Sequence, residues 1–107
     1  MITYVTELNS ENFSHSINSN PVVLVDIWAP WCGPCKMLSP IIDEVGAHFG
    51  NTVLVGKLDA DANSDVVKEL GVRNIPTVLI YKDGEIVDRF VGFKNKNEIT
   101  ALVEKHI

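Results

Sequence analysis

Residues 21–40 read PVVLVDIWAPWCGPCKMLSP, and the rest of the chain can be placed around them. The apolar run of residues 22–25 continues through Asp26 to Trp28 and is rich in β-branched side chains. A run of this kind between two prolines predicts a strand that is buried on both faces. Beyond the two cysteines, apolar residues recur at helical spacing, namely Leu38, Ile41, Ile42, Val45 and Phe49. The sequence therefore predicts a buried strand that delivers two cysteines to the first turn of a helix.

Cys32 and Cys35 stand where a thiolate is favoured. The N-terminus of a helix has free N–H groups and the positive end of the helix dipole, and both stabilise an anion. The thiolate is the nucleophilic form of cysteine. Pro34 suits the first turn because its missing N–H is not needed there, and Gly33 leaves room for the backbone of a partner. Two thiols three positions apart can also close on each other, so the pair can cycle between dithiol and disulfide.

Length and charge limit the classes of function. The chain has 107 residues, and 9 basic against 14 acidic residues give a net charge of −5. This length predicts a single domain over residues 1–107. The acidic balance argues against nucleic acid as a partner, and the longest apolar run is too short to cross a membrane. The first residues lack the basic and apolar regions of a signal peptide, so we expect a cytoplasmic protein.

The two cysteines fit redox chemistry better than a structural bridge or a metal site. Structural disulfides are rare in a reducing cytosol, and closing a loop of about four residues is worth only ~2 kcal/mol in the chain-entropy estimate. A zinc site needs four ligands, whereas His15, His48 and His106 stand singly. We therefore expect a redox-active pair and no metal.

The remaining segments predict an alternation of strands and helices. Expected strands cover residues 3–8, 52–59, 77–81 and 85–91, and expected helices cover 10–18, 63–70 and a final segment from Asn95. Asp83-Gly84 between two apolar runs predicts a hairpin. Asn95 with Glu98 three residues later predicts a capped helix start, and either Asn63 or Ser64 is expected to cap the helix before it.

Asp26 and Lys57 are charged residues inside apolar strands. Burial disfavours the charged form of a carboxyl, so we expect desolvation to raise the pKa of Asp26. A general base works best when its pKa lies near the working pH, which makes Asp26 a candidate to relay a proton to and from Cys35. A buried lysine nearly always needs a partner, and Asp26 is the obvious candidate for Lys57 if their two strands align as neighbours in the sheet.

Trp28 and Trp31 flank the cysteines on the upstream side. Trp28 lies on the predicted strand and is expected to be a core aromatic. Trp31 lies in the loop beside Cys32, where an aromatic is expected to be partly exposed and to contact a partner.

Several short motifs together resemble the thioredoxin family. WCGPC at residues 31–35 is preceded by VDIWA and followed by KMLSP, and the chain continues with KLDAD at 57–61, NIPT at 74–77 and VG at 91–92. Their order and spacing match over nearly the whole chain. The resemblance implies a thioredoxin fold of the α/β class. Its central mixed sheet has parallel strands and a C-terminal antiparallel hairpin, with flanking helices.

The resemblance also implies an activity and a site. A family member would be a general protein-disulfide reductase in which Cys32 attacks the substrate disulfide and Cys35 resolves the mixed disulfide. It would bind no cofactor, act as a monomer and be re-reduced by NADPH through thioredoxin reductase. The Ile75–Pro76 bond would be cis and packed against the dithiol. Substrate proteins would dock on Trp31, Ile75, Pro76, Val91 and Gly92.

Two other functions remain open at this point. A disulfide oxidase or isomerase of similar fold usually carries a histidine between the cysteines, and Gly33-Pro34 supplies no such group. The chain could also be a binding subunit of a larger assembly, with the dithiol incidental. Pro30, Asn74 and Phe93 depart from the common family pattern, and the last two bear on partner preference.

Overall fold

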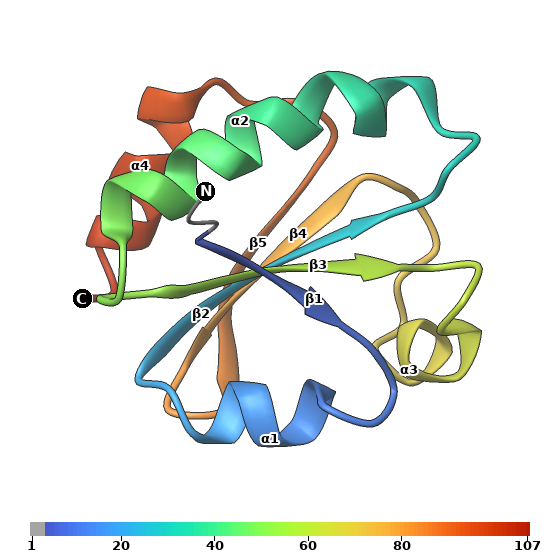
Figure 1. Cartoon of the computed structure of the whole chain (residues 1–107), viewed down its shortest axis with the longest axis horizontal. Helices are drawn as coiled ribbons and strands as arrows, with labels where there is room; N and C mark the ends of the chain where they lie inside the picture. The colour runs from blue at the N-terminus through green and yellow to red at the C-terminus, as the bar shows by residue number, and fades with distance from the viewer. Residues whose placement is uncertain (1–3) are drawn as a thin grey trace.

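The computed structural model describes residues 4–107, which form a five-stranded sheet with helices on both faces (Figure 1). The elements are, in chain order, β1 (Val5–Leu8), α1 (Phe13–Asn18), β2 (Val22–Trp28), α2 (Gly33–Phe49), β3 (Leu54–Asp59), α3 (Ser64–Glu69), β4 (Thr77–Lys82), β5 (Glu85–Val91) and α4 (Lys96–Glu104). This is the alternation that the sequence predicts. The expected first strand began at Thr3, which lies outside the described residues.

The sheet is mixed, with β2 at its centre. The strand order is β1-β3-β2-β4-β5. β3 runs parallel to both β1 and β2, whereas β4 is antiparallel to β2 and to β5. β2 can occupy the middle because its first six residues are all buried. The predicted parallel strands with a C-terminal antiparallel hairpin are therefore confirmed.

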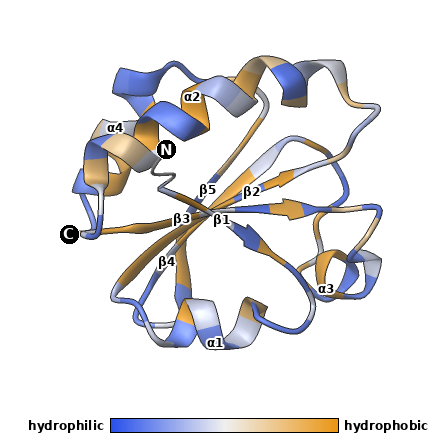
Figure 2. Ribbon diagram, in the orientation of Figure 1, coloured by the Kyte–Doolittle hydropathy of each residue, from blue (hydrophilic) through white to orange (hydrophobic). Residues whose placement is uncertain are grey.

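The two faces of the sheet pack against different helices. Figure 1 shows α2 and α4 on one face and α1 and α3 on the other. Side chains alternate along β2, so Val22 and Leu24 pack with the α2 and α4 core while Val23, Val25 and Ile27 pack on the opposite side. Figure 2 shows the central strands β2, β3 and β4 mainly hydrophobic, whereas hydrophobic and hydrophilic residues alternate along α2. The same alternation places Asp26 on the α2 face.

Two local signals are confirmed in detail. Asp83 and Gly84 join β4 to β5 with φ angles of 50° and 85°, which is the left-handed pair that a two-residue hairpin turn requires. At the start of α4, the side chain of Asn95 accepts the N–H of Glu98 at 2.8 Å, and the Glu98 carboxylate accepts the N–H of Asn95 at 3.2 Å. Both ends of this capping box are present.

The start of α1 differs from the prediction, and α3 starts where predicted but without a side-chain cap. Asn63 is the N-cap residue of α3, but its side chain makes no cap hydrogen bond. It accepts the N–H of Ser10 at 3.0 Å and donates to the carbonyl of Asp59 at 3.1 Å. α1 begins at Phe13 instead of residue 10, because Asn9 Oδ1 accepts the N–H groups of Glu11 and Asn12 and holds these residues in a turn.

Candidate active site

The strand-to-helix connection holds both cysteines at the start of α2. Cys32 is the N-cap residue with extended backbone angles, and Gly33 and Pro34 open the helix. Cys32 and Cys35 are joined in a disulfide. The backbone N–H of Cys35 donates to Sγ of Cys32 at 3.2 Å. A free helix N–H is thus aimed at the sulfur of Cys32, where it would stabilise a thiolate in the reduced protein.

Solvent exposure does not separate the two cysteines in the disulfide form. Cys32 is 4% exposed and Cys35 is 2% exposed. Both pack with Ala29 in a small cluster, against which Trp28 and Ile75 also pack. The distinction between the two residues is their position, since Cys32 precedes the helix and Cys35 lies within its first turn.

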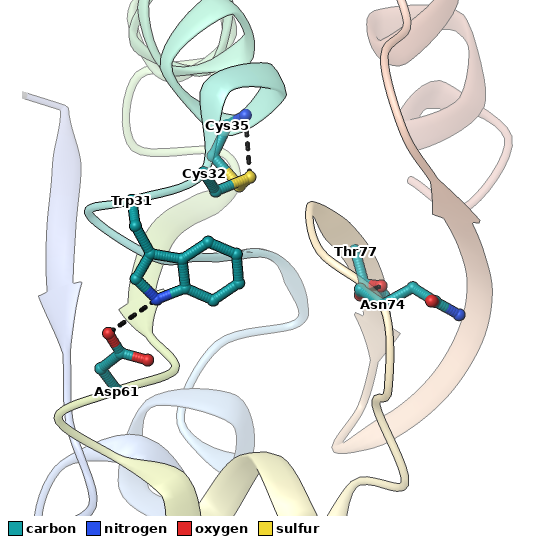
Figure 3. Close-up of a disulfide and its surroundings, with 6 residues drawn as sticks. All are labelled: Trp31, Cys32, Cys35, Asp61, Asn74 and Thr77. Atoms are coloured by element: carbon teal, nitrogen blue, oxygen red, sulfur yellow. Dashed lines mark hydrogen bonds between the residues drawn. A yellow bond between two sulfur atoms is a disulfide. The ribbon is translucent and has the colours of Figure 1, made fainter.

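Trp31 stands on the surface beside the disulfide. It is 70% exposed, and its Nε1 donates to Oδ2 of Asp61 at 2.9 Å. Figure 3 shows the indole next to the two sulfur atoms, with its nitrogen turned toward the Asp61 carboxylate. A large apolar ring is therefore held in place at the rim of the dithiol. Trp28 is half-buried and packs on the disulfide cluster, in keeping with an inward aromatic.

The loop before β4 forms the opposite rim of the site. The Ile75–Pro76 peptide bond is cis, as the resemblance implied. The Thr77 hydroxyl donates to the carbonyl of Asn74 (Figure 3). Asn74 itself is exposed, and its side chain points away from the disulfide.

The end of β5 joins this rim. Gly92 has a φ angle of 90°, and its N–H donates to the carbonyl of Pro76 at 2.9 Å. Val91 pairs with Thr77 in the sheet and is 59% exposed. Phe93 follows and is also exposed. The predicted docking residues thus come from three loops that are linked by contacts through Ile75 and Pro76.

Asp26 is buried beneath the site. It is 1% exposed, and its Oδ1 has no hydrogen-bond partner among residues 4–107. Burial raises the pKa of Asp26 from 3.8 to about 7; the cation of Lys57 lowers it, and the carboxylate of Asp43 raises it. Desolvation therefore outweighs the attraction of the cation, as expected from the apolar strand around this residue.

The predicted direct pairing of Lys57 with Asp26 is wrong. The two residues are register partners on β3 and β2, but Nζ of Lys57 lies 2.8 Å from Oδ1 of Asp43 and 2.7 Å from Oγ of Ser39. The ammonium is drawn to α2, where it stays partly solvated, instead of entering the apolar interior. Ser39 and Asp43 were not identified from the sequence. Their spacing of four places them on one helix face, but only the fold shows that this face lies over β3.

Other types of site receive no support in the described part of the chain. Residues 4–107 contain no group of three or more histidine, cysteine, aspartate or glutamate side chains placed to hold a metal ion. Within the same residues, no helix is both long enough and apolar enough to cross a membrane.

Comparison with known proteins decides the family. Residues 4–105 match the family model described as Thioredoxin. The chain belongs to the thioredoxin family. It is 43% identical over 103 residues to a thioredoxin of Bacillus subtilis (strain 168), which covers 96% of this chain and 98% of that relative. It is 40% identical over 104 residues to a thioredoxin of Pyropia yezoensis, with 96% and 97% covered.

Solved thioredoxin structures have the same fold. A mutant thioredoxin from Halobacterium salinarum NRC-1 superposes with a TM-score of 0.88 at 31% identity, covering 95% of this chain and 89% of that chain. Malassezia sympodialis thioredoxin (Mala s 13) gives the same TM-score and identity, with 98% and 92% covered. With the Cys32–Cys35 disulfide in the WCGPC segment, thioredoxin-family membership makes this protein a thiol-disulfide oxidoreductase that acts as a protein-disulfide reductase.

Proposed function

We propose that this thioredoxin-family protein reduces substrate disulfides by two successive exchanges with distinct roles for its cysteines. The Cys32 thiolate attacks one substrate sulfur, forming a mixed disulfide, and the other substrate sulfur leaves as a thiolate. Cys35 then attacks Sγ of Cys32, closing the Cys32–Cys35 disulfide and releasing the second substrate thiolate. The hydrogen bond from the Cys35 N–H to Sγ of Cys32 carries this assignment, because it stabilises negative charge on Cys32.

Asp26 is proposed as the group that takes the proton of Cys35. Cys35 is buried, so solvent water is scarce where its thiol must ionise. A carboxyl whose pKa is raised to about 7 by burial can accept a proton and return it near neutral pH. Lys57 contributes to this site through its positive charge, which favours the ionised form of Asp26.

The proposed docking surface consists of Trp31, Ile75, Pro76, Val91 and Gly92. Trp31 is an exposed apolar side chain beside the disulfide, and Val91 is an exposed apolar side chain at the end of β5, where it pairs with Thr77. Gly33 and Pro34 complete the surface at the start of α2, and a Cβ added at Gly33 would meet nothing within 4 Å apart from its chain neighbours and the adjacent backbone of its own helix. An extended substrate segment can hydrogen-bond to the backbone beside Pro76 in the manner of an added strand.

The proposed partners are disulfide-containing proteins and a reductase. The oxidised pair must regain two electrons after each turnover, and in this family the donor is NADPH through thioredoxin reductase. The redox-active disulfide itself is the electron carrier, so no bound cofactor is part of the proposal. A monomer in the cytoplasm suits this role, because a dithiol reductant works in a reducing compartment.

Trapping the intermediate tests the roles of the cysteines. Cys35→Ser should accumulate a mixed disulfide between Cys32 and a substrate such as insulin, because the resolving thiol is gone. Cys32→Ser should form none or far less. Iodoacetamide at neutral pH should label the reduced wild-type protein first at Cys32. Preferential labelling of Cys35 would reverse the roles of the two cysteines. Equal trapping of the mixed disulfide by both variants would show that the two cysteines have no distinct roles.

A further inference from the structure

A row of charged residues crosses three strands beneath α2. Glu7 on β1, Lys57 on β3 and Asp26 on β2 are register partners in turn. Aligned residues in a sheet point to the same face, here the face that α2 covers. The row runs inward, from the exposed Glu7 to a Lys57 side chain that is 20% exposed and then to the buried Asp26. Lys57 therefore lies between two carboxylates of the sheet, yet within residues 4–107 its ion pair is with neither.

The hydrogen-bond donors of the Lys57 ammonium are all taken by oxygen atoms of α2. The ammonium donates to Oγ of Ser39 at 2.7 Å, to the carbonyl of Ser39 at 3.3 Å and to Oδ1 of Asp43 at 2.8 Å. An ammonium group has three N–H donors, and these three oxygens belong to a single turn of one helix. No donor remains for Asp26, and this agrees with the unpartnered Oδ1 of that residue in the described chain.

The position of the ammonium also suits its solvation. Lys57 and Asp43 line a pocket of about 520 Å³ at the β1 edge of the sheet, together with Glu7, Trp28 and Asp59. Water can reach the charges from this side. A move toward Asp26 would take the ammonium inward and give the buried carboxyl a direct cation, which would hold it in the ionised form.

We propose that Ser39 and Asp43 are positioning residues that hold the ammonium of Lys57 against α2 and so keep the carboxyl of Asp26 free to exchange a proton with Cys35. The inference rests on the proposed role of Asp26. When Cys35 attacks Sγ of Cys32, its proton passes to Asp26, and the proton returns when the disulfide is reduced again. The charged groups that act on Asp26 are Lys57 and Asp43.

The experiment is a titration of Asp26 in the oxidised protein, followed by the ¹³C chemical shift of its carboxyl group. Ser39→Ala frees one Lys57 donor without changing any charge, so the pKa of Asp26 should fall by about one unit, the size expected when a cation approaches a carboxyl closely. Ser39→Thr keeps the hydroxyl and should retain the wild-type pKa. Asp43→Asn should also lower it, whereas Glu44→Gln, an exposed acid one position along α2, should not.

A Lys57→Met background separates an effect through Lys57 from a direct effect of the Asp43 charge. If Ser39 and Asp43 act by holding the ammonium, then Ser39→Ala shifts nothing in this background and Asp43→Asn shifts much less than in the wild type. Equal shifts in both backgrounds, or an unchanged pKa in Ser39→Ala, would overturn the proposal. Amide NMR spectra verify that each variant is folded.

The pH dependence of disulfide reduction gives an independent readout. The part of the pH–rate profile that depends on Asp26 should move to lower pH in Ser39→Ala, by the same amount as the pKa of Asp26 in the titration. The titration needs no turnover, so it remains informative even if the proposed proton transfer fails. In that case the pKa of Asp26 would move as described while the pH–rate profile would not.

Discussion

The carboxyl of Asp26 links stability to pH at the scale of a single residue. Burial raises its pKa from 3.8 to about 7. Between these two values the folded protein keeps a proton that the unfolded chain has lost. The free energy of unfolding therefore decreases as the pH rises from about 4 to about 7, by at most ~1.4 kcal/mol per pH unit, and this contribution is constant at higher pH.

Replacing Asp26 by alanine should separate stability from activity. The oxidised Asp26→Ala variant should unfold at higher urea concentration at pH 7.5, with a gain of about 3 kcal/mol, because the buried ionised carboxyl is removed. Between pH 4.5 and 7.5, the free energy of unfolding of this variant should decrease much less than that of the wild type. Stopped-flow reduction of a disulfide substrate should be slower at neutral pH.

The exposed Glu44→Ala on α2 serves as the control for the Asp26 variant. It should keep both the wild-type pH dependence of stability and the wild-type rate. Unchanged reduction rates in Asp26→Ala across neutral pH would leave this carboxyl a structural residue without a part in proton transfer.

Single residues also show what the sequence could and could not predict. An aspartate among apolar residues of a central strand was sufficient to predict burial and a raised pKa, because all its neighbours in sequence favour the interior. The partners of Lys57 could not be predicted in the same way. Their identity depends on which turn of α2 passes over β3, and this is set by the packing of helix on sheet.

At the scale of elements, the sequence correctly predicted local structures that depend on only a few neighbouring residues. The Asp83-Gly84 turn and the capping box of α4 each need only four or fewer neighbouring residues. The start of α3 at Asn63 was placed correctly, but a side-chain cap there does not form, because Asn63 is engaged by Ser10, which lies 53 positions away in the sequence. Contacts of that range compete with local capping, and the sequence pattern does not reveal them.

The capping box of α4 should contribute measurably to stability. Asn95→Ala removes the acceptor for the N–H of Glu98, and loss of an N-cap side chain typically costs about 1 kcal/mol. Urea denaturation of the oxidised protein measures the difference. Asn97→Ala, two residues later on the exposed side of the same helix, should change the free energy of unfolding by less than about 0.5 kcal/mol. Equal losses in the two variants would contradict a capping role for Asn95.

At the scale of the whole molecule, the topology brings segments that are distant in sequence to one site. β2 lies in the centre of the sheet and delivers the cysteines, while the loop before β4 and the end of β5 meet beside them. The central place of β2 follows from its apolar residues on both faces, and the hairpin follows from its turn. The meeting of three loops was expected only from the family resemblance, since no local pattern encodes it.

The docking surface should be sensitive to charge at one end of β5 and not at the other. Val91 is 59% exposed at the end of β5 that pairs with Thr77 next to Pro76, and Ile86 is 39% exposed near the other end of the same strand. Val91→Asp should raise the KM for a protein disulfide about tenfold, because docking would bury an unpaired charge. Ile86→Asp should leave KM near the wild-type value.

A small disulfide reagent provides the control for docking. It needs no extended surface, so the wild type, Val91→Asp and Ile86→Asp should react with it at similar rates. If Val91→Asp slowed the reaction with the small reagent as much as the reaction with the protein substrate, the substitution would act on the dithiol itself and not on docking.

The central claim is that catalysis passes through the Cys32–Cys35 dithiol, and insulin reduction coupled to NADPH through a thioredoxin reductase tests it most directly. The wild-type protein should accelerate NADPH oxidation in proportion to its concentration. The folded Cys32→Ser, Cys35→Ser double variant should give only the rate of the reductase and insulin alone. Faster NADPH oxidation with the double variant would contradict the account. So would a wild-type protein that fails to accelerate insulin reduction both with this donor and with dithiothreitol in its place.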